Sequence, residues 1–423
     1  MLFKYLLVYI TTFIGLFFCL LFLISLLERK TKNPPAPEKK PLVSVVIPAF
    51  NESETIKKCV NSVLAINWPK DKLEIIVVDD GSTDNTYKIA KSITAGNVRV
   101  LRQKNRGKGA ALNFGIKNSR GDFVATLDAD SFATKEVLNN MIGYFSDEET
   151  MIVTPALRIL NPKGILQRVQ HIEYVMGICM RKAFASLNSI YITPGPFSVF
   201  RRGFFEKHGY FDEHNITEDT EIGLRAQVKN CKIENSMDSV VYTVAPSDFK
   251  SLLKQRIRWY AGLVDNAARY KQIMSRKYGY LGLLTLPSAF ITTGLLLVLI
   301  ADLLYSYFKE VKDTVINLSL VNFDISPLIQ LKFLKPEYLI YQFANPLFFL
   351  FIIGLVFVIT ITLIGKYKSK DRKGIKLDFL YFLILYSILY SFWWMSMLLL
   401  KICGIKIGWG KDTKKHEKKN KRI

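Results

Sequence analysis

Long apolar stretches at both ends of the chain constrain its fold more than any other feature. Residues 2–27 are almost wholly apolar, and three further apolar runs lie at about 281–307, 339–365 and 378–403. Each is long enough to cross a bilayer, because a helix of about 20 apolar residues spans the hydrocarbon core. We therefore expect a multi-pass protein of the cell membrane, whose first run is a retained helix rather than a cleaved signal.

Basic residues gather at the borders of these runs. The chain of 423 residues carries a formal net charge of +22, although half of its residues are hydrophobic. Lys and Arg follow the first run directly, so the positive-inside rule places the next domain in the cytosol. We expect the basic residues to meet anionic lipid and not nucleic acid, since no RNA-binding motif or base-reading helix accompanies them. The five scattered cysteines show no metal-ligand spacing and suit a reducing cytosolic face.

The end of the chain raises a conflict of topology. Three crossings after a cytosolic domain leave the C-terminus outside, yet residues 411–422 are dense in Lys and Arg. The positive-inside rule favours an inward tail. Either the rule fails here, or Val315–Leu334, moderately apolar and interrupted by Asp324 and Pro327, supplies another membrane element. We favour the inward tail.

Between the apolar runs, short buried-strand patterns alternate with helical ones. Such repetition is typical of a mostly parallel sheet, whose binding groups collect at the carboxyl ends of the strands. The sequence predicts strands at 43–47 (ended by Pro48), 73–78, 98–102 and 122–127, a helix at 164–187 and a strand–turn–strand unit at 190–200.

Residues 248–267 predict an amphipathic helix with Ser247 as its N-cap and an apolar stripe on one face. Gln255, Arg258 and Trp259 fall at i, i+3 and i+4 and share the neighbouring face. An amide, a fixed cation and a large π-surface suit a diphosphate and the flat face of a sugar. We expect the helix to lie at the membrane surface, stripe down. An amphipathic core helix with a half-exposed Trp is the alternative.

Two acidic clusters follow predicted strands. Asp80 lies in Asp-Asp-Gly-Ser at 79–82, where its carboxylate can accept hydrogen bonds from a base edge or a ribose hydroxyl. Asp128 and Asp130 stand on alternate residues, so both can face a divalent cation bound to a diphosphate. A capping Asx turn in the first cluster and a polar turn in the second remain alternatives.

Two further segments carry candidate chemistry. Residues 105–109, Asn-Arg-Gly-Lys-Gly, form a basic loop that can reach phosphate or be a solvated turn, and its spacing is not that of a Walker loop. In Thr217-Glu218-Asp219, an Asp within reach of a hydroxyl can serve as general base. The same residues also fit a helix N-terminus capped by Thr217.

Taken in order, these motifs resemble those of the membrane-embedded processive family-2 glycosyltransferases, which include the hyaluronan, chitin, cellulose and poly-N-acetylglucosamine synthases. The likeness covers about residues 43–260 by motif and the rest by membrane layout. The motifs that carry it are Pro48-Ala49-Phe50-Asn51-Glu52, Asp79-Asp80-Gly81, Asp128-Ala129-Asp130, Thr217-Glu218-Asp219 and Gln255-Arg256-Ile257-Arg258-Trp259.

The resemblance implies a GT-A (Rossmann-like) α/β domain inserted between transmembrane helices, and an inverting, processive transfer from a UDP-sugar to a polysaccharide. Length and layout are most similar to those of poly-β-1,6-N-acetylglucosamine synthases, which implies UDP-N-acetylglucosamine as donor and leaves room for an accessory membrane subunit. The expected parts are a transmembrane helix (1–28), a linker (29–41), a cytosolic GT-A domain (42–246), an interfacial helix region (247–278), a transmembrane region (279–403) and a basic tail (404–423).

The resemblance also implies roles for individual residues. Asp219 would be the catalytic base, Asp128 and Asp130 would hold Mg²⁺ or Mn²⁺, and Trp259 and Glu218 would meet the acceptor. Trp409-Gly410-Lys411 is similar to a mobile gating segment of some synthases, with a membrane-edge Trp as the alternative. The residues expected to bind the nucleotide sugar are Pro48, Phe50, Glu52, Asp80, Lys108, Asp128, Gln255 and Arg258.

Two other functions remain to be separated from this one. A non-processive enzyme would move one sugar to a polyprenyl phosphate or another lipid, and the size of the product would reveal it. A catalytically inactive scaffold would lack at least one acidic motif, and all of them are present.

Overall fold

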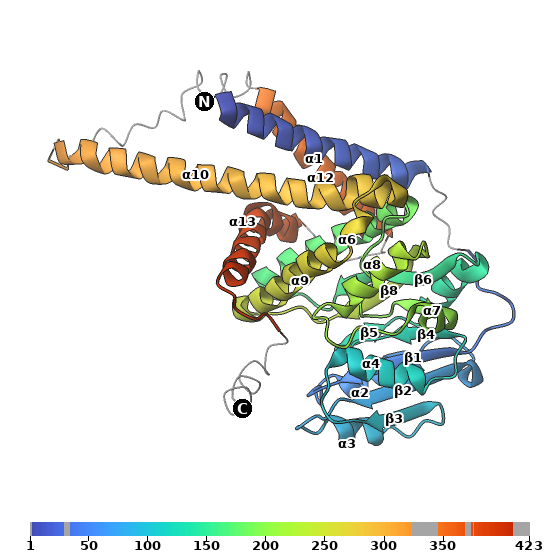
Figure 1. Cartoon of the computed structure of the whole chain (residues 1–423). Coiled ribbons are helices and arrows are strands. Elements are labelled where there is room, and N and C mark those ends of the chain that lie inside the picture. Colours follow the sequence, from blue (N-terminus) through green and yellow to red (C-terminus); the bar gives the residue numbers. More distant parts are fainter. Residues whose placement is uncertain are drawn as a thin grey trace. The chain divides into compact units, whose positions relative to one another are not determined.

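The computed structural model describes residues 2–28, 34–320, 322–323, 346–368, 374 and 376–408. These pack as two compact units, Met1–Ile24 with Leu286–Leu363, and Ser25–Thr285 with Ile364–Ile423. The second, here called the catalytic unit, contains the sheet and the helices around it (Figure 1). The division of the chain into six parts that the sequence predicts, from the helix at 1–28 to the basic tail at 404–423, stays a prediction.

The catalytic unit is an α/β structure. Its strands are β1 (Val43–Ala49), β2 (Leu73–Asp79), β3 (Val98–Arg102), β4 (Phe123–Thr126), β5 (Ser131–Ala133), β6 (Thr150–Ile159), β7 (Val199–Arg201) and β8 (Lys232–Thr243). Its α-helices are α2 (Ile56–Leu64), α3 (Thr86–Lys91), α4 (Lys108–Lys117), α5 (Val137–Met141), α6 (Ile165–Ser186), α7 (Arg202–His208), α8 (Glu218–Val228), α9 (Phe249–Arg269) and α13 (Lys376–Ile402). Short helical turns are η1 (Lys70–Lys72), η2 (Ile142–Ser146), η3 (Lys271–Ile273), η4 (Arg276–Tyr278) and the π-turn η5 (Leu281–Thr285).

The strands form one sheet in the order β3-β2-β1-β4-β7-β6-β8-β5. The first four are parallel, so the loops after β1, β2 and β4 leave the sheet at the same edge. β7 runs antiparallel to both β4 and β6. Parallel strands covered on both faces are buried throughout, which explains why every residue of β1 and β2 is buried and why all but Ser44, Glu74 and Asp79 are apolar.

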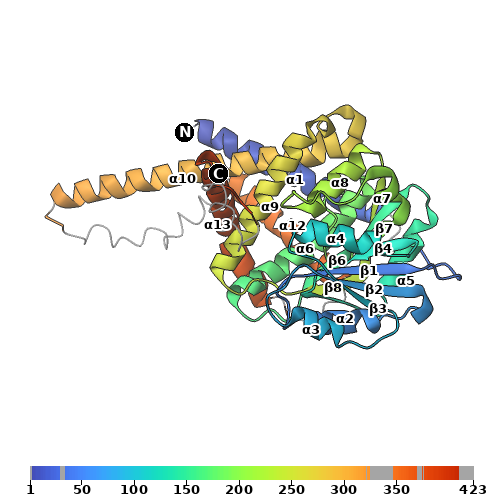
Figure 2. The ribbon, with the colours of Figure 1, turned by 60° about the horizontal axis from the view of Figure 1, so that its bottom comes forward.

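Helices cover both faces of the parallel strands (Figure 2). One core lies between β1 and α2, where Val45 and Ile47 pack near Val60. The other lies between β1 and α4, where Val46 packs with Leu112. Alternate residues of one strand thus serve two cores, as the period of two in a strand requires.

Three details differ from the sequence predictions. β1 continues through Pro48 to Ala49, and its pairing with β4 ends at Val46, so the ladder on that side needs no N–H from the proline. The unit expected at 190–200 has only β7 as a strand, because the preceding residues form a loop. The N-cap of α9 is Asp248, whose carboxylate accepts a hydrogen bond from Ser251 N, and not Ser247.

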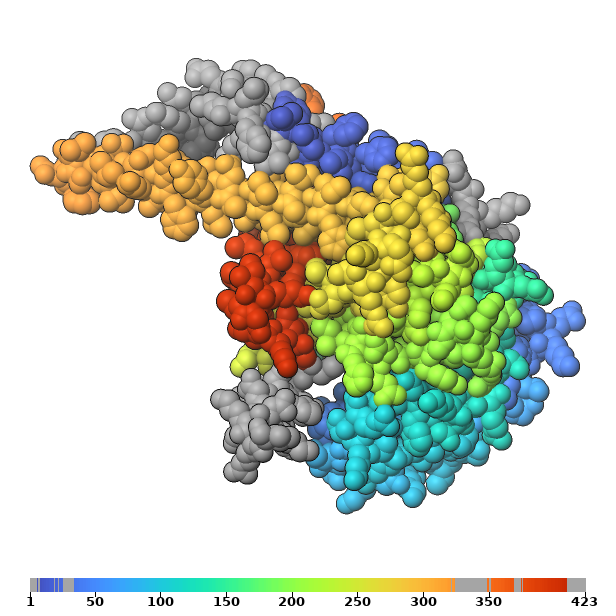
Figure 3. All heavy atoms as spheres, in the orientation of Figure 1, coloured from blue at the N-terminus to red at the C-terminus, as the bar shows by residue number. Residues whose placement is uncertain are grey.

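Helix α13 packs on α6 and α9 within the catalytic unit. Tyr260 of α9 stacks on Trp394 at 4.7 Å between ring centroids, and Phe249 lies 5.7 Å from Phe392. The atoms of α13, in red, lie directly against the yellow-to-green atoms of this unit in Figure 3. The aromatic part of the α9 stripe therefore contacts another helix, and the expected membrane-surface position of α9 stays a prediction.

Four described helices are long and apolar enough to cross a membrane, at Val8–Ser25, Leu281–Leu320, Phe351–Lys368 and Lys376–Ile402. The first three fall on α1 (Leu2–Glu28), α10 (Leu286–Leu320) together with η5, and α12 (Pro346–Lys368), and the fourth is α13.

The sequence suggests a further membrane element at Val315–Leu334. Its first residues do not begin a new helix, because α10 continues to Leu320. Residues 324–334, the tail at 411–422 and the gating segment from Trp409 lie outside the described residues.

Candidate active site

Carboxylates gather at the edge of the sheet where β1, β2 and β4 end. Glu52 follows β1, Asp80 follows β2, and Asp128 and Asp130 follow β4. Because β1 pairs in parallel with both of its neighbours, these segments meet at one edge. Glu218 and Asp219 reach the same place from the first turn of α8. We call the group of Glu52, Asp128, Asp130, Glu218 and Asp219 the acidic edge.

Lys108 joins the two halves of the acidic edge. Its Nζ lies 2.7 Å from Asp128 Oδ1 and 3.0 Å from Glu218 Oε1. Burial alone would lower the pKa of Lys108, but Asp128, Glu218 and Asp219 raise it above its ordinary value. A Cβ atom on Gly195 would lie 2.8 Å from Lys108 Nζ and 2.9 Å from Asp128 Oδ2, so a larger residue there would push these two side-chain ends aside. The ammonium thus holds residues 90 positions apart around one point.

Asp80 anchors the loop that leads to Lys108. Its Oδ1 accepts hydrogen bonds from Gln103 Nε2 (2.7 Å) and Arg106 N (3.0 Å), and its Oδ2 accepts one from Gly107 N (2.9 Å). Burial raises the pKa of Asp80, while these hydrogen bonds lower it. The loop lines a cavity of about 490 Å³ together with Gly81. Asp80 therefore fixes the entry to α4, whether or not it also contacts a nucleotide.

Asp219 is poised between like and opposite charges. Burial, followed by the nearby Glu218, raises its pKa to about 6, while Lys108 and Arg258 lower it. Its Oδ1 accepts from Thr220 N at 2.8 Å. Among the described residues every hydrogen bond to this carboxylate ends on Oδ1, which leaves Oδ2 to accept from a hydroxyl.

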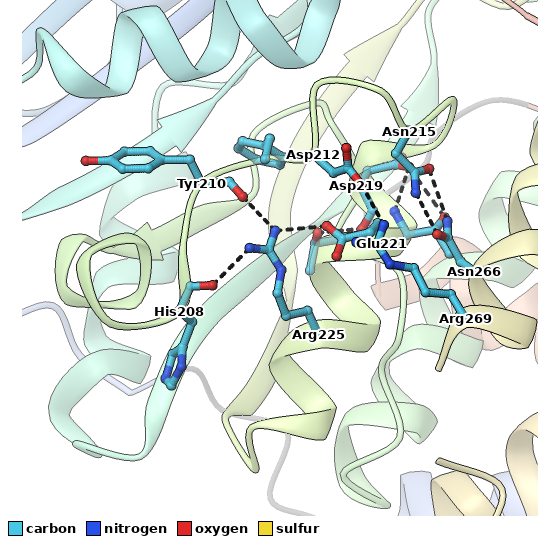
Figure 4. A network of polar contacts seen from close by, with 12 residues as sticks. His208, Tyr210, Asp212, Asn215, Asp219, Glu221, Arg225, Asn266 and Arg269 are labelled. Atoms are coloured by element: carbon cyan, nitrogen blue, oxygen red, sulfur yellow. Dashed lines mark hydrogen bonds and ion pairs between the residues drawn. The ribbon is translucent and has the colours of Figure 1, made fainter. Parts of the chain in front are cut away.

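Polar contacts clamp α8 between α9 and the α7–α8 loop (Figure 4). Asn266 of α9 and Asn215 exchange hydrogen bonds of 2.7 and 3.3 Å between their amides, and Asn266 Nδ2 also donates to Thr217 Oγ1 at 3.0 Å. Arg225 donates to the carbonyls of His208 and Tyr210. This clamp sets the start of α8, where Asp219 lies.

Asp128 and Asp130 present the donor set of a hard divalent cation. Burial, then the charges of Asp128 and Glu52, raise the pKa of Asp130 to about 7, so the negative charge of this group exceeds what its surroundings balance. The described residues contain no group of three or more His, Cys, Asp and Glu suited to a metal. Two carboxylates, those of Asp128 and Asp130, suit a cation that takes its other ligands from a diphosphate and water, as Mg²⁺ does.

The motif on α9 points in two directions. Arg258 faces the acidic edge, donates from Nη1 to the carbonyl of Ile216 at 2.9 Å and interacts with Glu218 and Asp219. Gln255 Oε1 is buried and accepts no hydrogen bond from the described residues. Trp259 is half-buried, with the guanidinium of Arg256 over its ring. Of the three residues predicted to share a face, Arg258 thus brings its guanidinium to the carboxylates, whereas Trp259 lies against Arg256.

Two expected site residues lie in or next to strand β1. Pro48 is a buried residue of β1 opposite Val78, and Phe50 is exposed just beyond the end of the strand. Glu52 donates from its backbone N–H to Thr86 Oγ1 at 2.7 Å and accepts at Oε2 from Thr55 Oγ1 at 2.7 Å. Burial raises the pKa of its carboxyl group.

Sequence reasoning missed three positioning residues. Thr193 donates from N and Oγ1 to the carbonyl of Asp219, at 3.2 and 2.9 Å. A Cβ atom on Gly262 would overlap the side chain of Thr217, so a glycine lets α9 approach the start of α8. Arg256 is buried and pairs with Glu173. Only Arg256 and Gly262 had a local signal, through their spacing of three residues from Trp259.

Comparison with known proteins agrees with this geometry. The family described as Glycosyl transferase family 2 matches residues 44–209. Residues 44–209 are thus similar to a family 2 glycosyltransferase domain. It is similar to the poly-beta-1,6-N-acetyl-D-glucosamine synthases of Staphylococcus aureus strain COL (34% identity) and Staphylococcus epidermidis (32%), each over 224 residues, 52% of this chain and 54% of the relative. The chain thus spans about half the length of the curated relatives it matches.

The fold of this family 2 domain is GT-A-like. The mannosyltransferase PcManGT from Pyrobaculum calidifontis, solved in complex with GDP-Man and Mn²⁺, aligns with 88% of this chain and 99% of its own at a TM-score of 0.61 and 18% identity. The resemblance to a processive membrane family, the GT-A-like α/β fold and the presence of long apolar helices beyond the domain are confirmed.

Proposed function

We propose that the protein catalyses an inverting, processive transfer of N-acetylglucosamine from UDP-N-acetylglucosamine to a growing polysaccharide. The observation that carries the proposal is the convergence on Lys108, which brings Asp219 and Asp128 to one point beside the α9 motif. The named activity of the staphylococcal relatives supports the sugar and the polymer.

In the proposed reaction Asp219 is the general base. An acceptor hydroxyl donates to Asp219 Oδ2 while its oxygen attacks the anomeric carbon. The new glycosidic C–O bond forms as the C–O bond to the diphosphate breaks on the opposite face, the proton passes to Asp219, and UDP leaves. A carboxyl group with a pKa of about 6 is ionised at neutral pH and still accepts a proton readily. One displacement inverts the anomeric centre.

Cationic groups of the chain would bind the diphosphate. Lys108 would move from bridging two carboxylates to contacting phosphate oxygens, and Arg258 already interacts with the same carboxylates. Both would offset the charge that grows on the leaving UDP. A Mg²⁺ or Mn²⁺ ion held by Asp128 and Asp130 would supply further electrostatic stabilisation of that charge. The orphaned Gln255 Oε1 would accept from a donor-sugar hydroxyl.

The proposal places the acceptor on Trp259 and the enzyme in the cell membrane. An indole ring offers a flat apolar surface to a sugar ring. The apolar helices α1, α10, α12 and α13 would cross the bilayer several times, and the catalytic unit would face the cytosol, where UDP-sugars are present. An accessory membrane subunit is compatible with this arrangement.

The test uses the full chain in purified membranes with a panel of labelled UDP-sugars. UDP release and product length are measured, with and without a chelator of divalent metals. The proposal expects a ladder of products from UDP-N-acetylglucosamine and a loss of activity on chelation that added Mg²⁺ or Mn²⁺ reverses. A single lipid-linked sugar would favour the non-processive alternative, and indifference to chelation would remove the metal from Asp128 and Asp130.

A further inference from the structure

Arg256 occupies the contact between α6, α9 and α13, which we call the helix seam. Its side chain is 3% exposed and donates two parallel hydrogen bonds to Glu173, from Nη1 to Oε1 (2.7 Å) and from Nη2 to Oε2 (2.6 Å). Tyr386 of α13 donates to the same Oε1 at 3.3 Å. Two-pronged geometry of this kind fixes the plane of the guanidinium as well as its position.

The fixed guanidinium contacts two indole rings. It lies 4.5 Å from the ring centroid of Trp259 and 5.0 Å from that of Trp393. Trp393 is fully buried, so this ring has no room to turn, whereas Trp259 is half-buried. A cation held from one side by Glu173 and Trp393 therefore restrains the less buried ring, Trp259, through its face.

A second contact fixes the rotation of α9 about its axis. Tyr260, the next residue after Trp259, stacks on Trp394 with an interplanar angle of 19°. Arg256 and Tyr260 lie one helical turn apart and both contact α13, so the helix can neither roll nor slide without losing one of them. Trp259 is thus oriented by its own helix and by the cation beside it.

We propose that Arg256 is a positioning residue that fixes the Trp259 ring as the platform for the acceptor sugar and ties that platform to α13. This inference rests on the proposed function, because it needs an acceptor that stacks on Trp259. A ring already held in its binding rotamer loses less conformational entropy when a sugar binds. Lysine cannot replace Arg256, since an ammonium lacks the planar fork that Glu173 holds and the flat face that covers the indole.

The test compares Arg256→Lys with Arg201→Lys in the full chain in membranes. Arg201 is a matched control, because its guanidinium also lies over two aromatic rings, Phe123 (5.6 Å) and Phe145 (5.5 Å), and donates to the Phe145 carbonyl. Three quantities are measured: the KM for a short β-1,6-linked N-acetylglucosamine oligosaccharide, the KM for UDP-N-acetylglucosamine, and hydrolysis of the donor without acceptor.

Arg256→Lys is expected to raise the acceptor KM about tenfold, as loss of one desolvated cation–π contact predicts. Donor KM and hydrolysis should stay within about twofold of wild type, since Lys108 and Arg258 are untouched. Arg201→Lys should leave the acceptor KM unchanged. An unchanged acceptor KM in Arg256→Lys, or an equal rise in both arginine variants, would overturn the proposal.

Two further variants separate positioning from general support of the fold. Glu173→Gln keeps the guanidinium but loosens its anchor, and should also raise the acceptor KM while hydrolysis persists. If both Glu173→Gln and Arg256→Lys lower hydrolysis as much as elongation, Arg256 is only structural. In a Trp259→Phe background the effect of Arg256→Lys should shrink, whereas additive effects would contradict action through the indole.

The wild-type result distinguishes failure of this inference from failure of the proposed function. If wild type elongates no oligosaccharide, the proposed function and the acceptor platform fall together. If wild type elongates it and Arg256→Lys does so with the same acceptor KM, only the positioning role falls.

Discussion

The acidic edge and the helix seam differ in how their buried charged side chains are paired with opposite charges. In the seam two carboxylates have close counterparts: Glu173 accepts two hydrogen bonds from Arg256, and Asp378 lies 3.7 Å from Arg168 and 3.2 Å from the ring of His171. At the edge, carboxylates outnumber the cations among the described residues, and burial, followed by the neighbouring carboxylates, raises the pKa values of Asp130 and Asp219. The same chain thus balances its charges in one place and leaves them unbalanced in another.

The difference indicates what each region is for. Matched buried pairs define one arrangement of helices, because separating either pair leaves an uncompensated charge. Crowded carboxylates are costly until cations and hydrogen-bonding ligands arrive, so they belong where a ligand binds. The seam therefore serves as the frame and the edge as the site, and substitutions in each should behave differently.

The largest effect is expected from removing the base of the edge. Asp219→Asn should lower kcat by roughly 10²–10⁴-fold, the usual contribution of a general base. UDP affinity should stay nearly unchanged, because Lys108 and Arg258 remain. Sugar transfer and UDP binding by calorimetry would measure both. Asp147→Asn, which alters an exposed aspartate paired with Lys232, is the control and should keep full activity. Full turnover by Asp219→Asn would end the assignment of the base.

A smaller loss of transfer activity is expected where α9, a helix of the seam, contacts the start of α8 beside the acidic edge. Gly262→Ala would force the side chain of Thr217 away from α9, and a misplaced start of α8 should cost about 10²-fold in transfer. Overpacking of this kind also destabilises by roughly 1–3 kcal/mol. Gly177→Ala is the matched control, because a Cβ there on helix α6 meets only the end of Arg181. Transfer rate and melting temperature are measured for both variants. Equal values for Gly262→Ala and Gly177→Ala would show that the close contact of α9 with Thr217 does not matter for transfer.

The two regions were also unequally predictable from the sequence. The acidic edge could be located because parallel strands end together, so Asp128 and Asp130 had to lie at the same edge of the sheet as Asp80. The central bridge from Lys108 to Glu218 could not, since it joins the starts of two helices, α4 and α8, that lie 110 residues apart in the sequence. The seam could not be predicted, for a related reason. An apolar stripe on α9 fits a lipid surface and another helix equally well, and only the fold brings α13 to Tyr260.

The pH dependence of transfer gives a finer test of the edge. Asp219 can accept a proton only when it is ionised, and its pKa is raised to about 6. Transfer should therefore hold above that pH and fall about tenfold for each unit below it. Initial rates at saturating donor measure the profile. An ordinary, unshifted carboxyl group would move the fall to near pH 4, and that result would show that burial and Glu218 do not act on Asp219.

The smallest expected effect is on the free energy of unfolding. Its sign follows from the excess of carboxylates at the acidic edge. Because the pKa of Asp130 is raised to about 7, the folded state binds a proton there more readily than the unfolded chain does. The free energy of unfolding then decreases as the pH rises from about 4 towards 7. Without divalent metal, Asp130→Asn should raise the melting temperature at pH 7.5 by roughly 2–4 °C.

The gain should be smaller at pH 4.5, where Asp130 is already protonated in the fold. Asp122→Asn, at the exposed residue just before strand β4, should show no gain at either pH. Added Mg²⁺ should stabilise wild type and not Asp130→Asn, since a bound cation removes the same excess of charge. A lower melting temperature for Asp130→Asn at pH 7.5 would mean that this carboxylate is already balanced, like Glu173 in the seam, and that the edge is not built to receive a cation.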